Sequence, residues 1–336
     1  MGSHKTLKRR LFRSSSRAEP IIGNLPPKST STTARLAESP AFHHDTAPDI
    51  LKIREFSRWR TLSMSLLWLR VAILLYGIAA LAVLPAALYD RPHWRHIAIP
   101  ATVAAVLFHF VSLAEMLNVA HHRLPVDTHE TQTLLGLLLA IAFLVVYWRY
   151  RTVSLGVFIL PICFLLGLVP AFHPGQENTA FPMVHTGWIF LHVALLLAAY
   201  AALLISLLAS LLYLIQERRL KQKSPALPWL PPLETPLEVL DQIALKALLF
   251  GLPCMTAGLL IGSLIAQVTV GASYFRDPKI LLAFALWLAY IAMIYIRRAA
   301  GLRGRRAVYL SSFVFFVVLA VWAANQFSAV HRFTAP

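Results

Sequence analysis

Eight long apolar runs are the feature that most constrains how this chain can fold. They cover residues 65–88, 97–117, 132–148, 152–172, 187–215, 244–269, 280–296 and 308–330. A helix that crosses a bilayer needs about 20 apolar residues, and the hydrocarbon core admits only segments that satisfy their own backbone hydrogen bonds. We therefore expect an all-α integral membrane protein, a bundle of about eight transmembrane helices.

The composition supports this class. Of the 336 residues, 58% are hydrophobic and 14% are charged, and the mean hydropathy is +0.64, whereas a soluble domain is about half apolar and a quarter charged. A net charge of +16 would suggest nucleic-acid binding in a soluble protein. Here the basic residues gather in a tail and in alternate loops, so we expect lipid around the chain and no nucleic-acid partner. Both cysteines, Cys163 and Cys254, fall inside apolar runs, which excludes a CxxCH haem-attachment motif.

The first 63 residues differ from the rest of the chain. They are rich in Ser, Thr, Pro, Lys and Arg, with no sustained apolar period, a composition typical of disorder. No apolar core of a signal peptide is found in this stretch. We predict a basic, disordered tail over 1–63 and a membrane domain over 64–336.

The charges of the loops predict an orientation. Lys and Arg concentrate after the first, third, fifth and seventh runs, which places these loops in the cytoplasm and the corner Gly271–Ile280 outside. Eight spans then place the basic tail outside as well, against the same rule. Three explanations remain: the tail is translocated against the rule, one of the eight spans is false, or the native product begins at Met64, directly ahead of the first run. We favour the last.

Two patterns predict local packing. In the fifth run, small residues recur at every fourth position, and the sixth run holds a GxxxG pair, Gly258 and Gly262; such spacing lets helix backbones approach closely. The small residues of the fifth run are Ala194, Ala198, Ala202, Ser206 and Ser210. After this run, Thr235, Pro236 and Glu238 predict a helix start with Thr235 as the N-cap of a capping box.

Three histidines lie within or at the ends of apolar runs, where ionisable groups are costly. His192 and His331 fall at similar depth near the outer ends of the fifth and eighth runs, and both flank the Gly271–Ile280 corner. Two neutral imidazoles at one depth suit the two faces of haem, as axial ligands of its iron. The alternative is that each histidine only hydrogen-bonds a neighbouring helix. His109 lies midway through the second run, with Glu115 as its visible partner, and is a structural or relay candidate.

Other kinds of site have no motif in the sequence. No GxxxxGK[ST] phosphate loop, HExxH zinc pair or GxSxG elbow occurs. A transporter is expected to show broken helices at equivalent places in two repeats. Pro100, Pro161 and Pro253 interrupt runs, but no internal repeat accompanies them.

Five sequence blocks, in order, resemble the cytochrome c assembly membrane proteins, which include the haem-handling subunit of the system II synthase and HemX-like proteins. The resemblance covers about 64–333. The blocks are "LHVALLLAAYAALLISLLASLLYLIQERRLK", "LPPLET", "FGLPCMTAGLLIGS", "DPKILLAFALWLAYIAMIY" and "GLRGRRAVYL".

This resemblance implies a haem-presenting corner at Gly271–Ile280. Synthase members carry a platform of the form WGxYWxWDPKE, and this chain keeps Gly271 and the sequence Asp277-Pro278-Lys279. Val270, Tyr274 and Arg276 stand where the family has tryptophans, Ile280 where it has glutamate, and Tyr295 where synthases have an intramembrane histidine. Lost indoles remove stacking area, which Arg276 would partly offset by pairing a haem propionate. The resemblance places the haem-flanking histidines at His192 and near His331, with Tyr274, Arg276 and Asp277 as further cofactor-binding candidates.

We therefore expect a multi-pass protein of the bacterial inner membrane that handles haem at its outer face as an accessory factor in cytochrome c biogenesis. Because the platform tryptophans are replaced and no soluble domain is available, we expect it not to be an enzyme. Its partners would be other cytochrome c maturation or haem-biosynthesis proteins. Two alternatives remain open: a HemX-like regulator or scaffold of haem biosynthesis without bound haem, and a small-solute transporter.

Overall fold

The computed structural model describes residues 46–88, 92–119, 128–172, 186–222, 235–299, 301 and 305–323. The chain divides into two units, Met1–Pro48 and Asp49–Pro336. The first unit lies almost entirely outside the described residues, and the second holds the helices. The described residues contain α-helices and one short 3-10 helix and no strand, which confirms the expected all-α class.

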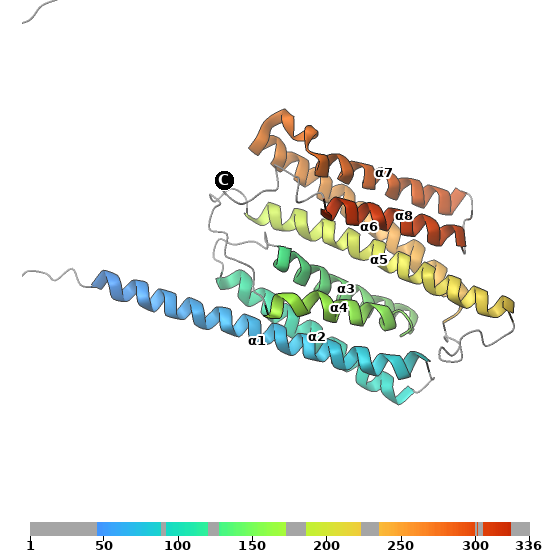
Figure 1. Cartoon of the computed structure of the whole chain (residues 1–336), viewed down its shortest axis with the longest axis horizontal. Helices are drawn as coiled ribbons and strands as arrows, with labels where there is room; N and C mark the ends of the chain where they lie inside the picture. Colours follow the sequence, from blue (N-terminus) through green and yellow to red (C-terminus); the bar gives the residue numbers. More distant parts are fainter. Residues whose placement is uncertain are drawn as a thin grey trace, which may run out of the picture. The chain divides into compact units, whose positions relative to one another are not determined.

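The described residues form eight α-helices, one for each apolar run. Figure 1 shows these helices coloured in chain order. Their bounds are α1 Thr46–Leu88, α2 Pro92–Val119, α3 Thr128–Tyr150, α4 Gly156–Phe172, α5 Thr186–Gln222, α6 Leu237–Val270, α7 Pro278–Ala299 and α8 Arg305–Ala323, with the 3-10 helix η1 Gly271–Arg276 between α6 and α7. Pro100, Pro161 and Pro253 lie inside continuous α2, α4 and α6, so these prolines do not break the helices as a transporter pattern would require.

Six described helices are long and apolar enough to cross a membrane, and α4 and α8 contribute shorter apolar segments. The candidate spans are Met64–Ala87, His93–Met116, Thr131–Tyr150, Gly187–Lys221, Leu237–Val268 and Pro278–Ala299. Large apolar side chains such as Leu81, Val268 and Phe316 remain exposed on these helices. An exposed apolar surface of this kind suits contact with lipid.

Helix α1 begins earlier than the first apolar run. It starts at Thr46, so the last part of the predicted 1–63 tail is helical in this structure. The candidate span inside it begins at Met64. The remainder of the tail lies outside the described residues, and the proposed start at Met64 stays a prediction.

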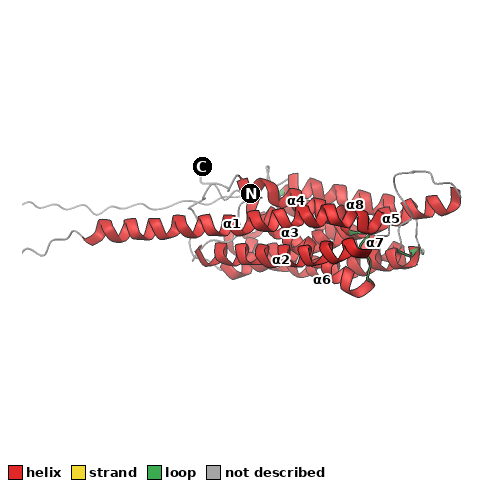
Figure 2. Cartoon of the chain, turned by 90° about the horizontal axis from the view of Figure 1, so that it is seen from below, coloured by secondary structure: helices red, strands yellow, loops and turns green. Residues whose placement is uncertain are grey.

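Helix α5 occupies the centre of the described bundle. It packs against α3 on one side and against α6 and α8 on the other, while α7 packs against both α6 and α8. Figures 1 and 2 show these helices lying side by side. One apolar core joins α1–α4 with parts of α5 and α6, and another joins α5–α8. The 3-10 helix η1 contacts α6 and α7, two of the helices that form the second core.

The start of α6 differs from the predicted capping box. The helix begins at Leu237 with Pro236 at the N-cap position, and no side chain caps it. The hydroxyl of Thr235 instead hydrogen-bonds the hydroxyls of Thr152 and Ser154 in the α3–α4 connection, the latter at 2.8 Å. The N-cap prediction was wrong because a distant pair of hydroxyls, brought near by packing, competes for the Thr235 side chain.

Candidate functional site

The GxxxG pair of α6 is where α5 approaches most closely. A Cβ atom built on Gly258 would lie 2.8 Å from Leu196, and one built on Gly262 would lie 2.3 Å from the Cε1 atom of His192. Both distances are shorter than any normal contact. The glycines are therefore required by side chains of α5 that lie against the α6 backbone, which confirms the predicted close approach.

His192 is held against α6 by a hydrogen bond. Its Nδ1 lies 2.7 Å from the carbonyl oxygen of Gly258. A carbonyl oxygen can only accept, so Nδ1 carries the hydrogen, and in the neutral ring Nε2 keeps the lone pair. A hydrogen bond to a neighbouring helix is what the alternative interpretation of His192, a purely structural histidine, predicts. It is also the arrangement in which a histidine presents Nε2 to a metal.

The corner at Gly271–Ile280 is built by two helix ends. Gly271 has φ +75°, a backbone conformation that favours glycine, and its N–H bonds the carbonyl of Gln267 at the end of α6. At the start of α7, the Asp277 carboxylate accepts a hydrogen bond from the Lys279 N–H at 2.9 Å. Asp277 is thus the N-cap of α7 and Pro278 is its first residue, which gives the Asp-Pro-Lys sequence a structural reason.

The predicted cofactor-binding residues at the corner have different surroundings. Arg276 is exposed, whereas Asp277 is buried and bonded to the α7 backbone. Tyr274 lies in η1, where the structure describes its backbone position alone. Phe275 is exposed and stacks on Phe284, with ring centroids 6.1 Å apart. Phe275 was not predicted as a site residue, although its place between the replaced tryptophan positions Tyr274 and Arg276 is a signal in the sequence.

His331, the second predicted iron ligand, lies outside the described residues, so its pairing with His192 stays a prediction. His109 is described and is buried between helices of the first core. Its Nδ1 lies 3.4 Å from the Tyr76 hydroxyl. Glu115 bonds the Trp68 indole instead, at 3.0 Å, so the structure gives His109 a different partner from the one visible in the sequence. Their spacing along α2, almost two turns, lets each reach a different residue of α1.

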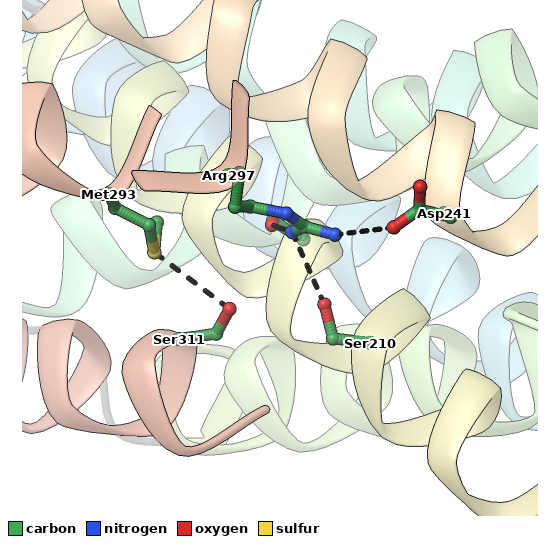
Figure 3. Close-up of polar contacts among 6 residues, drawn as sticks. Ser210, Asp241, Met293, Arg297 and Ser311 are labelled. Atoms are coloured by element: carbon green, nitrogen blue, oxygen red, sulfur yellow. Dashed lines mark hydrogen bonds and ion pairs between the residues drawn. The ribbon is translucent and has the colours of Figure 1, made fainter. Parts of the chain in front are cut away.

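At the other end of α5–α7, a charged pair lies inside the bundle. Arg297 of α7 donates to the Asp241 carboxylate of α6 at 2.9 Å and to the hydroxyls of Ser206 and Ser210 of α5 at 3.5 and 3.4 Å. Figure 3 shows the guanidinium reaching between these helices, with Met293 one turn before it bonded to Ser311 of α8.

This cluster was not predicted from the sequence. Arg297 directly follows the seventh apolar run, among the basic residues of a loop, and Ser206 and Ser210 fit the small-residue pattern of the fifth run. A signal was present, because Arg297 continues the buried face of α7 at helical spacing from Tyr290, Met293 and Ile294.

With this geometry established, comparison with known sequences identifies the lineage. The profile of the family described as "Cytochrome C assembly protein" matches residues 126–324, more than half of the chain. The chain belongs to the cytochrome C assembly protein family. The matched range runs from just before α3 to the end of α8, narrower than the expected 64–333. Within this family domain lie His192, the corner at η1 and the Arg297 cluster.

Several curated relatives of this family are called "Cytochrome c biogenesis protein CcsA". The protein from Guillardia theta is 28% identical over 215 residues, which cover 58% of this chain and 71% of the relative. The protein from Heterosigma akashiwo is 25% identical over 234 residues, 60% of this chain and 73% of the relative. A Prochlorococcus marinus protein is 28% identical over 171 residues, 46% of this chain and 55% of the relative. No solved structure matches.

Proposed function

We propose that this protein is a haem-handling accessory factor in cytochrome c biogenesis that binds haem at the extracytoplasmic face of a bacterial inner membrane. The observation that carries the proposal is the bond from His192 Nδ1 to the Gly258 carbonyl. It fixes the tautomer that leaves Nε2 for iron. The family match and the biogenesis name of the relatives support the same role.

The residues of the corner fit the periphery of a haem. The porphyrin is a large apolar plate with two carboxylates, and a haem supplies an iron that takes imidazole ligands. His192 would hold the iron from the α5–α6 interface, and His331 would be the second ligand. The exposed Phe275 offers apolar area, and the exposed Arg276 offers a guanidinium for a propionate. Asp277 would act indirectly, by holding the start of α7 in place.

We further propose that the protein does not itself catalyse thioether formation. Three tryptophan positions of the family platform are occupied by Val270, Tyr274 and Arg276, so the stacking area that holds haem for transfer is reduced. Its role would be to hold haem for other maturation proteins. Deleting the gene should then lower, without abolishing, the haem-stained c-type cytochromes of the host.

The direct test is the visible spectrum of the purified full chain after haem supplementation. We expect a Soret band in the wild type that is lost in His192→Ala and in His331→Ala. His96→Ala is a matched control, because His96 is exposed near the start of α2 and lies outside the α5–α6 interface. This variant should keep the Soret band. Added imidazole should restore the band in His192→Gly, which a merely structural role of the ring would not predict. A wild type that stays colourless would reject the haem site.

A further inference from the structure

A groove lined by residues of α6 and α7 opens on the surface of the described bundle. Its volume is about 440 Å³, within the range of about 300–1,000 Å³ usual for small-ligand sites. The α6–α7 groove is lined by Leu252, Ile291, Ile294, Tyr295, Arg298 and Ala299. Most of this lining is apolar, and the two polar members, Tyr295 and Arg298, belong to the last turns of α7.

The two neighbouring arginines of α7 have opposite surroundings. Successive residues of an α-helix lie about 100° apart around its axis, so Arg297 faces the bundle while Arg298 faces outward. Arg297 is buried and bonded to Asp241, whereas Arg298 is exposed. No acidic partner of Arg298 is found within the described ranges. Among the described residues, an exposed cation therefore stands without an acidic partner at one end of an apolar groove.

The position of this cation along the membrane normal suits a lipid headgroup. Arg298 is next to the last residue of the candidate span Pro278–Ala299, and Tyr295 is 70% exposed one turn before it. Tyrosines gather at the membrane–water interface, and basic residues between helices on the cytoplasmic side bind anionic headgroups. Helix α8 begins at Arg305 and packs against α7, so the exposed Arg306 lies toward the same end of α7, where its charge favours an anion.

We propose that the α6–α7 groove is a binding site for one anionic phospholipid, with its acyl chain along the apolar wall and its phosphate at Arg298. The ligand is an anionic amphiphile because a zwitterionic lipid would bring its own cation to Arg298. This site is separate from His192, which lies near the other end of α5, and it does not rest on the proposed function.

The test is native mass spectrometry of the full chain in detergent, titrated with phosphatidylglycerol or with phosphatidylcholine of the same acyl chains. We expect the wild type to retain a first phosphatidylglycerol molecule at lower lipid concentration than phosphatidylcholine. Arg298→Gln should weaken phosphatidylglycerol binding about fivefold, the factor expected for one juxtamembrane cation. Arg218→Gln removes an exposed arginine near the C-terminal end of α5 that does not line the groove. It should leave phosphatidylglycerol binding unchanged within about twofold, because the attraction of a headgroup to a cation falls off with distance.

A second variant tests the apolar wall. Ile291→Trp fills the groove but keeps Arg298, so it should weaken binding of the lipid without changing its preference for the anionic headgroup. Equal binding of the two lipids by the wild type, or equal losses in Arg298→Gln and Arg218→Gln, would overturn the proposal. So would displacement of the lipid by inorganic phosphate alone, or by haem in the His192→Ala protein, since these results would assign the groove to another ligand.

Discussion

Arg297 Nη2 lies 2.9 Å from Asp241 Oδ1, and this bond ties α7 to α6 at the end that the loop charges place in the cytoplasm. The arginine side chain is only 4% exposed and that of the aspartate 19%. The same guanidinium bonds two serines of α5. One side chain therefore connects three helices, at the opposite end of the family domain from His192.

Replacing Asp241 with Asn should destabilise the protein, because it leaves the guanidinium buried without its counter-charge. We expect a loss near the lower end of the range of about 3–5 kcal/mol for breaking a buried pair, since the aspartate is partly exposed. Thermal unfolding in detergent, followed by tryptophan fluorescence, measures this loss. Arg218→Gln, which removes an exposed arginine of α5, is the control and should unfold as the wild type does. An Asp241→Asn protein as stable as the wild type would show that the pair stabilises nothing.

Replacing Gly262 with Ala should push the His192 ring away from α6. The new Cβ would stand 2.3 Å from Cε1, and overpacking of this kind costs about 1–3 kcal/mol. Combining it with His192→Ala should recover most of that loss, which a double-mutant cycle measures by thermal unfolding. Gly187→Ala, which meets no atom within 4 Å, should be neutral. If the two substitutions at 262 and 192 are simply additive, the ring does not lie over this glycine.

Gly251→Ala should be the more severe of the two glycine changes. Its Cβ would fall 1.8 Å from the Tyr290 hydroxyl, which is buried and donates to the Ala199 carbonyl at 3.2 Å. Tyr290→Phe alone should cost about 1 kcal/mol for the lost hydrogen bond, and it should partly rescue Gly251→Ala. Unfolding midpoints of the single and double variants measure the coupling. If Tyr290→Phe does not rescue Gly251→Ala, the Tyr290 hydroxyl does not lie against Gly251.

Asp277→Ala should cost about 0.5–2 kcal/mol, the usual range for an N-cap, because the Lys279 N–H loses its acceptor. Asp277→Asn keeps an oxygen in place and should retain most of the stability. The comparison separates capping from charge: if Asn is as harmful as Ala, the carboxylate acts through its charge rather than as a cap. Unfolding midpoints at matched pH are the measurement.

The positions of the helices could be predicted because a membrane span is a local sum of apolar residues. The apolar runs anticipated all eight α-helices, and the small residues Gly258 and Gly262 anticipated the close approach of α5 to α6. The same local rules gave the wrong cap at Thr235 and did not show the partner of His109. In both cases a residue more than 30 positions away in the chain took the bond.

The candidate site, like the fold, could be predicted only in part from the sequence. The sequence shows a histidine, His192, inside an apolar run, where an ionisable residue is unusual. It also shows that the corner at Asp277 resembles a haem platform. That Nδ1 of His192 bonds the Gly258 carbonyl, and that Asp277 caps α7, required the structure. A hydrogen bond across two helices depends on their rotation and depth relative to each other, which a single run does not contain.

The sequence by itself determined that this chain is a multi-helix membrane protein of the cytochrome C assembly family, because hydropathy and motif order are properties of the chain read linearly. The tertiary structure alone decided which of two adjacent arginines, Arg297 and Arg298, is buried as an ion-pair partner and which is exposed. The two residues are chemically identical and differ by one step around a helix. Packing of α7 against α5 and α6 assigns them different environments, because a buried charge must find a counter-charge while an exposed one need not.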